Sequence, residues 1–537
     1  MPNGADCTSE LERSGGRVGQ ANWEQTVAEG GQTGEVMLQT LLQGVQVRSG
    51  LPNRELNIAG VANDSRKVEP GWLFVAIHGV ATDGNLYAKD AATRGTVAVL
   101  SEDPAPANWQ PEIPWIQVSE GRKALATAAA NFYGRPAAAL KLVGVTGTNG
   151  KTTTTSLIDS ILRASGAKTG LFGTIAYHTP TGERPAPNTT PESLDLQKFF
   201  AEIRDAGGTY ATLEASSHAL ALDRLWGCHF AVAVFTNLTR DHIDYHKTFE
   251  NYFAAKRLLF QGTGAGAPDV SVINSDDEWG RKLVGLAGRT LTYGLQNGAD
   301  LRVKKFQLSF KGLNFTAQTP NGPIQVESSL VGRINVYNIL AAIGTGIGLG
   351  ISREVIEMGI RNLRAVAGRF ERVDLGQPFL VVVDYAHTDD ALENLIRTAR
   401  ELNTKGRIIT VFGCGGSRDR TKRPIMGELS GRLSDLSILT SDNPRQEDPL
   451  KIISDVVVGM QRSGGRYLIE PDRAKAIHRG IGEARAGDIV LLAGKGHEDY
   501  QIFADHTIHF DDREVAAEAL SDQGYTARPE NGTGFGT

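Results

Sequence analysis

Cysteine is scarce in this chain of 537 residues, and long apolar runs are missing. The three cysteines, Cys7, Cys228 and Cys414, are too few and too scattered for a disulfide framework or a CxxC metal site. No apolar run reaches the roughly 18 residues that a membrane-spanning helix needs. The opening segment, MPNGADCTSELERSGG, lacks the basic start and apolar core of a signal peptide. We therefore expect a cytoplasmic protein with reduced thiols and no membrane insertion.

An excess of positive charge is also missing. The formal net charge is -5, and Lys and Arg form no long cluster, which argues against nucleic acid as a partner. Hydrophobic residues make up 40% of the chain and charged residues 22%, as in ordinary globular proteins. Because a domain typically has roughly 100 to 200 residues, the length predicts three domains. We expect a monomer.

Apolar, β-branched segments alternate with amphipathic helical segments along most of the chain. Examples are LKLVGVTG followed by TTTTSLIDSILRAS, and FLVVVDYAH followed by DALENLIRTARELN. This alternation predicts an α/β fold with mainly parallel sheets. Gly and Pro interrupt the pattern near residues 139 and 367, which predicts domains at 36–138, 139–366 and 367–520. The polar, Gly-rich ends, 1–35 and 521–537, are predicted to be disordered.

The segment GVTGTNGKTTTTSL, residues 144–157, predicts a phosphate-binding loop between a strand and a helix. Its spacing departs from G-x-x-x-x-G-K-[ST], because Val145 stands where the first glycine belongs. Backbone N–H groups and the helix N-terminus attract phosphate, Lys151 can reach the β- and γ-phosphate oxygens, and Thr152 can offer a hydroxyl to Mg²⁺. The candidate ATP-binding residues of this loop are Gly147, Thr148, Asn149, Gly150, Lys151, Thr152 and Thr153.

A candidate metal ligand follows the apolar stretch TYATLE, which ends at Glu214. Ligands gather at the carboxyl ends of parallel strands, so this carboxylate is expected to emerge near the phosphate loop. A hard cation such as Mg²⁺ prefers oxygen ligands, and Glu214 supplies one.

Four motifs, TGTNGKT, LEASSHAL, TNLTRDHIDYH and AAK, resemble in this order the Mur ligases, the ATP-dependent amide-forming enzymes of peptidoglycan precursor synthesis. The resemblance spans roughly residues 40 to 515, and the family's loop has the short T-G-T-N-G-K-[ST] form. It implies a central P-loop ATPase domain, an N-terminal α/β domain for the UDP end of one substrate, and a C-terminal Rossmann-like domain for the incoming amino acid. Since each domain holds one reactant, we expect hinge motion near residues 139 and 367.

The resemblance also implies two Mg²⁺ ions. Thr152 and Glu214 would hold one, and Glu214, His242 and Lys256 the other. In the family this lysine is carbamylated, so carbon dioxide would convert the Lys256 cation into an anionic oxygen ligand. The implied catalytic residues are Lys151, Glu214, His242 and Lys256.

Further matches concern the nucleotide-sugar substrate and ATP. The resemblance assigns the UDP-muramoyl peptide to Ser65, His78, Asn188, Thr189, Thr190, Ser216 and Arg224. It assigns ATP, beyond the loop, to Asn335, Asn338, Arg369 and Asp384. The amides can hydrogen-bond a purine, and the guanidinium can pair with phosphate oxygens. Two positions depart from the family pattern: Leu222 replaces a common glutamine and Asp389 a common proline.

The segment TSDNPRQEDP, residues 440–449, indicates which amino acid is added. Within the family branch that adds the third stem-peptide residue, D-N-P-R is typical of enzymes that use meso-diaminopimelate. That amino acid has a distal carboxylate, which an arginine fork can bind bidentately, whereas lysine would leave the guanidinium unpaired. The candidate residues are Arg418, Asp442, Asn443, Pro444, Arg445, Gly494 and Glu498, the last suited to an ammonium group.

The resemblance implies that ATP phosphorylates the D-glutamyl γ-carboxylate of UDP-N-acetylmuramoyl-L-alanyl-D-glutamate, and that an amine of diaminopimelate then displaces phosphate. A lysine-adding enzyme and folylpolyglutamate synthetase are the enzyme alternatives; the latter should lack D-N-P-R and the domain at 40–138. A non-catalytic NTP-binding switch is the third alternative, and it would use the loop only to sense nucleotide.

Overall fold

The computed structural model describes residues 34–79, 82–109, 112–296, 298–403 and 405–526. The two predicted disordered ends therefore lie mostly outside the described residues. The second one, predicted to start at residue 521, overlaps helix α17 (Asp512–Asp522). The helix extends this far because Leu520 is buried and Tyr525 packs edge to face on Phe379, with ring centroids 5.9 Å apart. Within the described residues, no helix is long and apolar enough to cross a membrane.

The first of three layered units contains a five-stranded sheet in the order β2-β7-β6-β5-β4. Its strands are β2 (Val47–Ser49), β4 (Gly60–Ala62), β5 (Trp72–Ala76), β6 (Ala98–Ser101) and β7 (Trp115–Val118). The neighbours from β4 to β7 pair in parallel, and β2 pairs antiparallel with β7. Helices α2 (Leu38–Leu41) and α4 (Gly121–Phe132) cover one face, and α3 (Ala88–Thr93) covers the other.

The second unit is built on an eleven-stranded sheet in the order β11-β10-β9-β12-β8-β13-β14-β15-β16-β17-β18. These strands are β8 (Lys141–Thr146), β9 (Thr169–Phe172), β10 (Ala176–Thr179), β11 (Gly182–Pro185), β12 (Tyr210–Glu214), β13 (Phe230–Phe235), β14 (Val270–Asn274), β15 (Arg289–Gly294), β16 (Leu301–Ser309), β17 (Gly312–Gln318) and β18 (Ile324–Ser328). The strands from β9 to β16 pair in parallel, while both ends of the sheet are antiparallel. The antiparallel extension β16–β18 was not predicted from the sequence.

Helices cover both faces of this central sheet because its middle strands are apolar on both sides. Val143 and Val145 of β8 pack in one core with α5 (Lys151–Ala164), α11 (Arg333–Gly348) and α12 (Arg353–Asn362). Leu142, on the opposite face of β8, packs in a second core with α6 (Ser193–Asp205) and α9 (Phe249–Gln261). Strands buried on both faces are typical of parallel sheets.

The third unit has a six-stranded sheet in the order β19-β20-β24-β21-β22-β23. Its strands are β19 (Glu371–Val373), β20 (Leu380–Asp384), β21 (Ile408–Phe412), β22 (Leu436–Leu439), β23 (Tyr467–Ile469) and β24 (Ile489–Ala493). All pairs except β19–β20 are parallel. Helices α13 (Asp389–Leu402), α14 (Lys422–Leu433) and α15 (Pro449–Ser463) cover one face, and α16 (Arg473–Gly482) and α17 the other.

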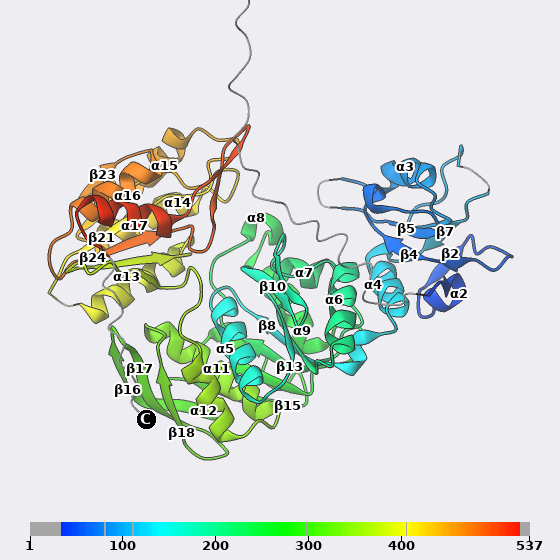
Figure 1. The fold of residues 1–537 in the computed structure, drawn as a ribbon, viewed down its shortest axis with the longest axis horizontal. Coiled ribbons are helices and arrows are strands. Elements are labelled where there is room, and N and C mark those ends of the chain that lie inside the picture. The colour runs from blue at the N-terminus through cyan, green and yellow to red at the C-terminus, as the bar shows by residue number, and fades with distance from the viewer. Residues whose placement is uncertain (1–33, 80–81, 110–111, 297, 404, 527–537) are drawn as a thin grey trace, which may run out of the picture.

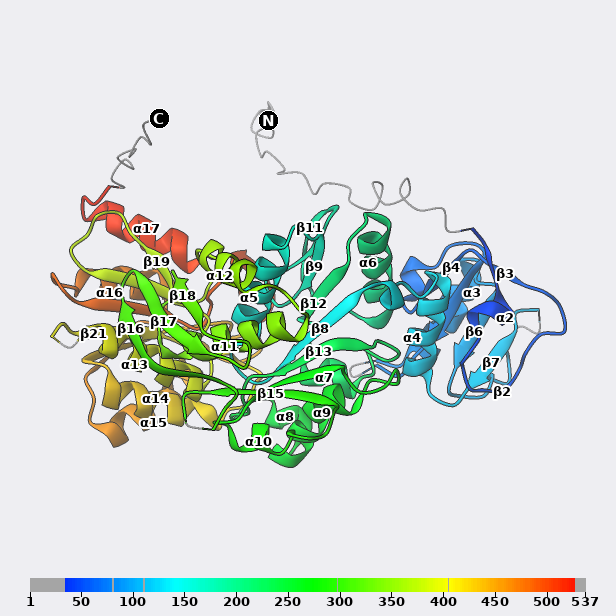
Figure 2. The same cartoon turned by 90° about the horizontal axis from the view of Figure 1, so that it is seen from below.

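The three units follow each other in space as they do along the chain. Figures 1 and 2 place the first, blue sheet and the third, yellow-to-red sheet on opposite sides of the central, cyan-to-green unit. The predicted α/β fold with three domains and mainly parallel sheets is confirmed. The predicted limits near 139 and 367 fall between sheets, at the end of the short helix Pro136–Ala139 and before β19.

Candidate active site

The phosphate loop connects β8 to α5 at the carboxyl end of the parallel central strands. Gly147 has φ of 150°, and a Cβ there would lie 1.8 Å from Thr236 Oγ1. Gly150 has φ of 86° and caps α5 without a side-chain hydrogen bond, so the first N–H groups of the helix are left for a ligand. Asn237 Oδ1 accepts from Asn149 N at 2.9 Å and fixes the loop from β13.

Two lysine ammonium groups converge on this loop. Lys151 Nζ donates to Gly147 O at 3.0 Å and to Thr148 O at 2.8 Å, and Lys256 Nζ, from α9, donates to Gly147 O at 2.7 Å. Burial and the nearby Lys151 lower the pKa of Lys256 well below its usual range. Burial also lowers the pKa of Lys151, which Glu214 opposes. Two lysine side chains therefore face the position where phosphate is expected.

Glu214 ends β12, the strand next to β8, and its side chain is 1% exposed. Thr174 donates two hydrogen bonds to this carboxylate, from its N at 2.9 Å and from its Oγ1 at 3.1 Å. A Cβ on Gly173 would lie 2.4 Å from Glu214 Oε1, so only glycine leaves room for the carboxylate. His242 precedes α8 (Ile243–His246), and its ring packs edge to face on His218 at 4.8 Å.

The predicted metal ligands supply some, but not all, of the oxygen ligands that Mg²⁺ requires. Glu214 and Thr152 supply oxygen atoms, but the described residues include no cluster of three His, Cys, Asp or Glu ligands around Glu214 or His242. A buried amine with a lowered pKa stands at Lys256, and an amine reacts with carbon dioxide in its neutral form. A carbamate there would provide the missing carboxylate, so these residues fit the two implied ions.

The predicted muramoyl-peptide residues of the central unit lie around Thr190. Its Oγ1 donates to Glu214 O at 2.6 Å and accepts from Ser216 N at 3.1 Å. Arg224 donates to Thr190 O at 2.9 Å and pairs with Glu192 at 2.7 Å. The other two predicted residues, Asn188 and Thr189, are held from β10 and the β9–β10 turn: Tyr177 donates to Asn188 O, and the hydroxyls of Thr174 and Thr189 are 3.1 Å apart.

The remaining two predicted nucleotide-sugar residues lie in the first unit. Ser65 follows β4 and is 6% exposed, while His78 follows β5. Because β4 and β5 pair in parallel, both residues lie at one edge of that sheet. The His78 ring lies 3.4 Å from Asp83 and 3.4 Å from Asp103. The structure therefore groups these seven residues into two sets on different units.

A hydrogen bond from Arg369 brings the third unit to the phosphate loop. Arg369 Nη2 donates to Thr152 Oγ1 at 3.1 Å, and its Nε is buried without a hydrogen-bond partner among the described residues. Asp384 accepts from Phe370 N at 2.7 Å and from Ala386 N at 2.8 Å. Asp384 thus fixes the backbone next to Arg369 and leaves that guanidinium directed at the loop.

A cavity of about 120 Å³ adjoins the loop, between α11, the ends of β13 and β14, and α13. Asn338 lines it and donates from Nδ2 to Asn335 Oδ1 at 2.8 Å. Asn338 Oδ1 would lie 2.5 Å from a Cβ on Gly150, so the amide packs directly on the phosphate loop. The other lining residues are Thr236, Asn237, Thr239, Asn274, Tyr293, Ile334, Tyr337, Asp390 and Asn394.

The predicted amino-acid site lies at the carboxyl ends of β21, β22 and β24. Asn443 is 3% exposed and donates from Nδ2 to Glu498 Oε2 at 2.9 Å. Arg445, with φ of 51°, donates from Nη1 to Gly416 O at 3.0 Å. A Cβ on Gly494 would lie 2.7 Å from Asp442 Oδ2. Pro444 is buried and Arg418 is exposed in the loop after β21.

Sequence reasoning missed four residues that hold these sites together: Thr174, Asn237, Asp390 and Lys495. Thr174 orients Glu214, Asn237 supports the loop, and Asp390 Oδ2 accepts from Asn149 Nδ2 at 2.6 Å. Lys495 contacts Asn443 and Glu498. Asn237 stands inside the quoted motif TNLTRDHIDYH, and Asp390 is the first residue of the quoted segment DALENLIRTARELN, so these two positions were available as a signal.

The two residues that depart from the family pattern, Asp389 and Leu222, lie at the ends of helices. Asp389 is the first residue of α13, whose N-cap Thr388 accepts from Ala391 N at 3.2 Å. Proline is favoured at this first helical position, and an aspartate suits it as well because its charge complements the helix N-terminus. Leu222 follows the short helix α7 (Ser217–Ala221) and is only partly buried.

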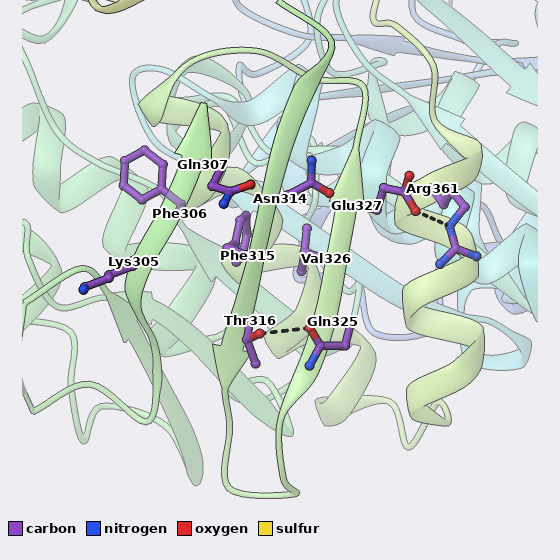
Figure 3. Close-up of a pocket in the computed structure, with 10 residues that line it drawn as sticks. All are labelled: Lys305, Phe306, Gln307, Asn314, Phe315, Thr316, Gln325, Val326, Glu327 and Arg361. Carbon is purple, nitrogen blue, oxygen red and sulfur yellow. Dashed lines mark hydrogen bonds and ion pairs between the residues drawn. The ribbon is translucent and has the colours of Figure 1, made fainter. Parts of the chain in front are cut away.

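A larger hollow, about 620 Å³, lies on β16, β17 and β18 with Arg361 from α12 at its side (Figure 3). The figure shows Arg361 directed at Glu327, with the two side chains 3.3 Å apart. No predicted site residue lines this hollow, so it is separate from the candidate active site.

Known proteins resemble this chain over nearly all of its length. Residues 57–133 match the Mur ligase family, catalytic domain; residues 145–346 the Mur ligase middle domain; and residues 368–496 the Mur ligase, glutamate ligase domain. The UDP-N-acetylmuramoyl-L-alanyl-D-glutamate–2,6-diaminopimelate ligase of Solibacter usitatus (strain Ellin6076) is 56% identical over 473 residues, 88% of this chain and 95% of that protein.

Two further relatives have the same description. The ligase of this name from Geobacillus kaustophilus (strain HTA426) is 46% identical over 475 residues, 87% of this chain and 96% of that protein. A solved structure of a UDP-N-acetylmuramoyl-L-alanyl-D-glutamate–2,6-diaminopimelate ligase is 34% identical and has a TM-score of 0.63, covering 92% of this chain and 100% of that one. With three matching domains and relatives of this identity and coverage, the chain belongs to the Mur ligase family.

Proposed function

We infer that this protein is an ATP-dependent amide ligase that adds meso-2,6-diaminopimelate to UDP-N-acetylmuramoyl-L-alanyl-D-glutamate in peptidoglycan precursor synthesis. One observation carries the inference: the phosphate loop of a Mur ligase is joined, through Thr152 and Arg369, to the unit that carries the D-N-P-R segment. The 56% identical relative is named for this reaction.

The reaction makes a poor acyl donor reactive. The D-glutamyl γ-carboxylate attacks the γ-phosphate of ATP, giving an acyl phosphate and ADP. An amine of diaminopimelate then attacks the acyl carbon, and phosphate leaves as the amine loses a proton. No side-chain nucleophile takes part, so the protein contributes positioning and electrostatic stabilisation.

Lys151 and Arg369 are proposed to neutralise charge on the transferred phosphoryl group. Among the described residues, Lys151 donates only to the carbonyls of Gly147 and Thr148, which a phosphate oxygen can replace as acceptors. The Arg369 Nε has no partner among the described residues, so its fork has a donor left for phosphate. We place the adenine end of ATP in the 120 Å³ cavity beside Asn338.

Two Mg²⁺ ions are proposed as cofactors. Thr152 and Glu214 would hold one, and Glu214, His242 and Lys256, as a carbamate, would hold the other. Bound there, the metals would supply further positive charge to the phosphoryl oxygens. The chain's own contribution is the orientation of the Glu214 carboxylate by Thr174 and the burial of the Lys256 amine.

Substrate recognition is divided among the three domains. We propose that Ser65 and His78 bind the UDP end and that the Thr190 loop, with Ser216 and Arg224, binds the muramoyl peptide. Arg445 and Arg418 would bind the distal carboxylate of diaminopimelate, and Glu498 its ammonium group. We propose that the protein acts as a monomer in the cytoplasm, where ATP is available.

The alternatives fit less well. The N-terminal sheet of residues 47–118 and the D-N-P-R segment argue against folylpolyglutamate synthetase. A lysine-adding ligase would leave the Arg445 guanidinium without a carboxylate. A nucleotide-sensing switch would not need an amino-acid site at the end of the third sheet.

The test uses purified protein with ATP, Mg²⁺ and UDP-N-acetylmuramoyl-L-alanyl-D-glutamate, with diaminopimelate and lysine offered in competition. We expect phosphate release that depends on both the muramoyl dipeptide and the amino acid, and a product that contains diaminopimelate. Phosphate release without either substrate would support the switch, and a lysine product would support the lysine-adding ligase.

A further inference from the structure

Lys495 is a buried cation in the proposed amino-acid site, with no assigned role. It follows β24, lies between Gly494 and Gly496, and its side chain is 0% exposed. Its Nζ lies 3.2 Å from Glu498 Oε2 and 3.3 Å from Asn443 Oδ1, and it sits 5.5 Å from the centroid of the Tyr500 ring. A buried lysine persists in proteins when it is paired, and here the pairing is to two candidate binding residues.

These contacts form a closed triangle between two strand ends. Asn443, after β22, donates from Nδ2 to the same Glu498 Oε2 at 2.9 Å. Asn443 Oδ1 accepts from Lys495 Nζ and also from Ile502 N at 3.0 Å, so the amide orientation is determined on both sides. Glu498 Oε2 thus receives two hydrogen bonds, whereas no hydrogen bond to Oε1 occurs among the described residues. One carboxylate oxygen is anchored and the other is left for a ligand.

The charged groups around Glu498 shift its pKa in opposite directions. Burial and the Asp442 carboxylate raise the pKa of Glu498, and Lys495 lowers it. Tyr385, Tyr500 and Arg473 also lie near enough to interact electrostatically with Glu498. Of the two cations, Lys495 is the one that contacts the Glu498 carboxylate, because Arg473 forms its ion pair with Asp512.

We propose that Lys495 is a positioning residue for diaminopimelate, which keeps Glu498 ionised and directs its Oε1 toward the substrate ammonium. The proposal rests on the ligase function inferred above. Lys495 does not contact substrate; it acts through Glu498 and, by the Asn443 amide, on the segment that leads to Arg445. The added amino acid is therefore selected by a charged network rather than by Arg445 and Glu498 alone.

Two variants separate charge from hydrogen bonding. Lys495→Met keeps the length of the apolar stem and removes the cation, and Lys495→Gln removes the cation but keeps an N–H donor. We expect the KM for diaminopimelate at pH 7 to rise at least tenfold in both, with unchanged KM values for ATP and the muramoyl dipeptide. Without the cation Glu498 ionises at higher pH, so raising the pH should restore the KM toward that of the wild type at the same pH.

A matched control is Lys475→Met, which removes a surface lysine that pairs with Asp472 at 3.6 Å on α16 of the same domain. The control should leave the KM for diaminopimelate and its pH profile unchanged. If Lys495→Met does not fold, as judged by circular dichroism, Lys495→Gln carries the comparison. An unchanged KM, or a KM raised equally at every pH, would overturn the proposal. A wild type without diaminopimelate-dependent phosphate release would instead overturn the proposed function.

Discussion

Asn149 of the phosphate loop and Asp390 of α13 are joined by a hydrogen bond of 2.6 Å between domains, from Asn149 Nδ2 to Asp390 Oδ2. Thr239 Oγ1 lies 3.4 Å from the same oxygen. Asp390 also lines the cavity proposed for the adenine end of ATP. One carboxylate therefore connects the cavity proposed for adenine to the docking of the C-terminal domain.

Asp390→Ala should weaken the use of ATP. Charge-assisted hydrogen bonds contribute about 1.5–3 kcal/mol, so kcat/KM for ATP is expected to fall by about 10- to 150-fold. Asp389→Ala is the matched control, because the neighbouring Asp389 Oδ1 has no partner among the described residues. Steady-state kinetics with ATP varied would measure both. Equal losses in the two variants would show that the Asn149 contact is not the cause.

Lys151→Met should remove most of the ligase activity while keeping the apolar stem in place. The loss of one preorganised donor to developing charge costs about 10²- to 10³-fold in kcat, and we expect at least 10²-fold. ADP formation in the presence of all three substrates is the measurement. Lys311→Met, in the exposed turn after β16, should retain full activity. A Lys151→Met enzyme with wild-type kcat would contradict the proposed phosphoryl contact.

Arg445→Ala should lower the preference for diaminopimelate over lysine by about tenfold or more, measured as the ratio of kcat/KM values. Arg445 has φ of 51°, a conformation that strains any residue with a Cβ, so Arg445→Lys is a second variant with similar backbone demands. Lysine keeps the charge without the bidentate fork and should keep only part of the preference. Arg462→Ala, on the exposed end of α15, is the control. An unchanged ratio in Arg445→Ala would place selection elsewhere.

Glu447 should contribute stability that depends on pH. The Arg423 guanidinium, 0% exposed, binds it through two hydrogen bonds of 2.9 Å and lowers its pKa to about 2. Because its pKa is lower in the folded than in the unfolded state, the ionised Glu447 stabilises the fold at pH values above the unfolded-state pKa of about 4.3. This contribution is lost as the pH falls toward about 2.

Glu447→Gln should therefore lower the melting temperature most at pH 7, and the difference from the wild type should shrink below about pH 4.5. Calorimetry at pH 7, 5 and 3 would follow this difference. Glu518→Gln, an exposed carboxylate on α17, should show little change at any of the three values. A difference that is constant across this range would mean that the ion pair does not titrate as described.

Binding of all ligands should make the protein more compact. Ser65 and His78 lie in the N-terminal domain, whereas Thr190 lies in the central domain, and one substrate is proposed to contact both sets. Small-angle scattering with and without ATP, Mg²⁺, the muramoyl dipeptide and diaminopimelate would measure the radius of gyration. ATP alone should have a smaller effect, because the C-terminal domain already contacts the phosphate loop. An identical profile in all conditions would contradict domain closure.

Much of the site was accessible from sequence because its residues follow apolar strands. Glu214 ends β12, Gly494 directly follows β24 and Asp442 comes shortly after β22, and parallel strands bring such positions to one edge of a sheet. The antiparallel extension β16–β18 was missed. Its strands alternate buried and exposed residues, which is the period of a half-buried strand, so this alternation indicates the extension although it carries no site motif.

The order of strands and helices, the phosphate loop and the identity of the candidate residues were determined by the sequence itself, because hydrophobic periodicity and local motifs depend on neighbours along the chain. The pairings of Asn149 with Asp390, Arg369 with Thr152 and Lys495 with Asn443 were decided only by the tertiary structure. These partners lie 241, 217 and 52 residues apart, and their contacts follow from domain docking and parallel pairing, which no local pattern encodes.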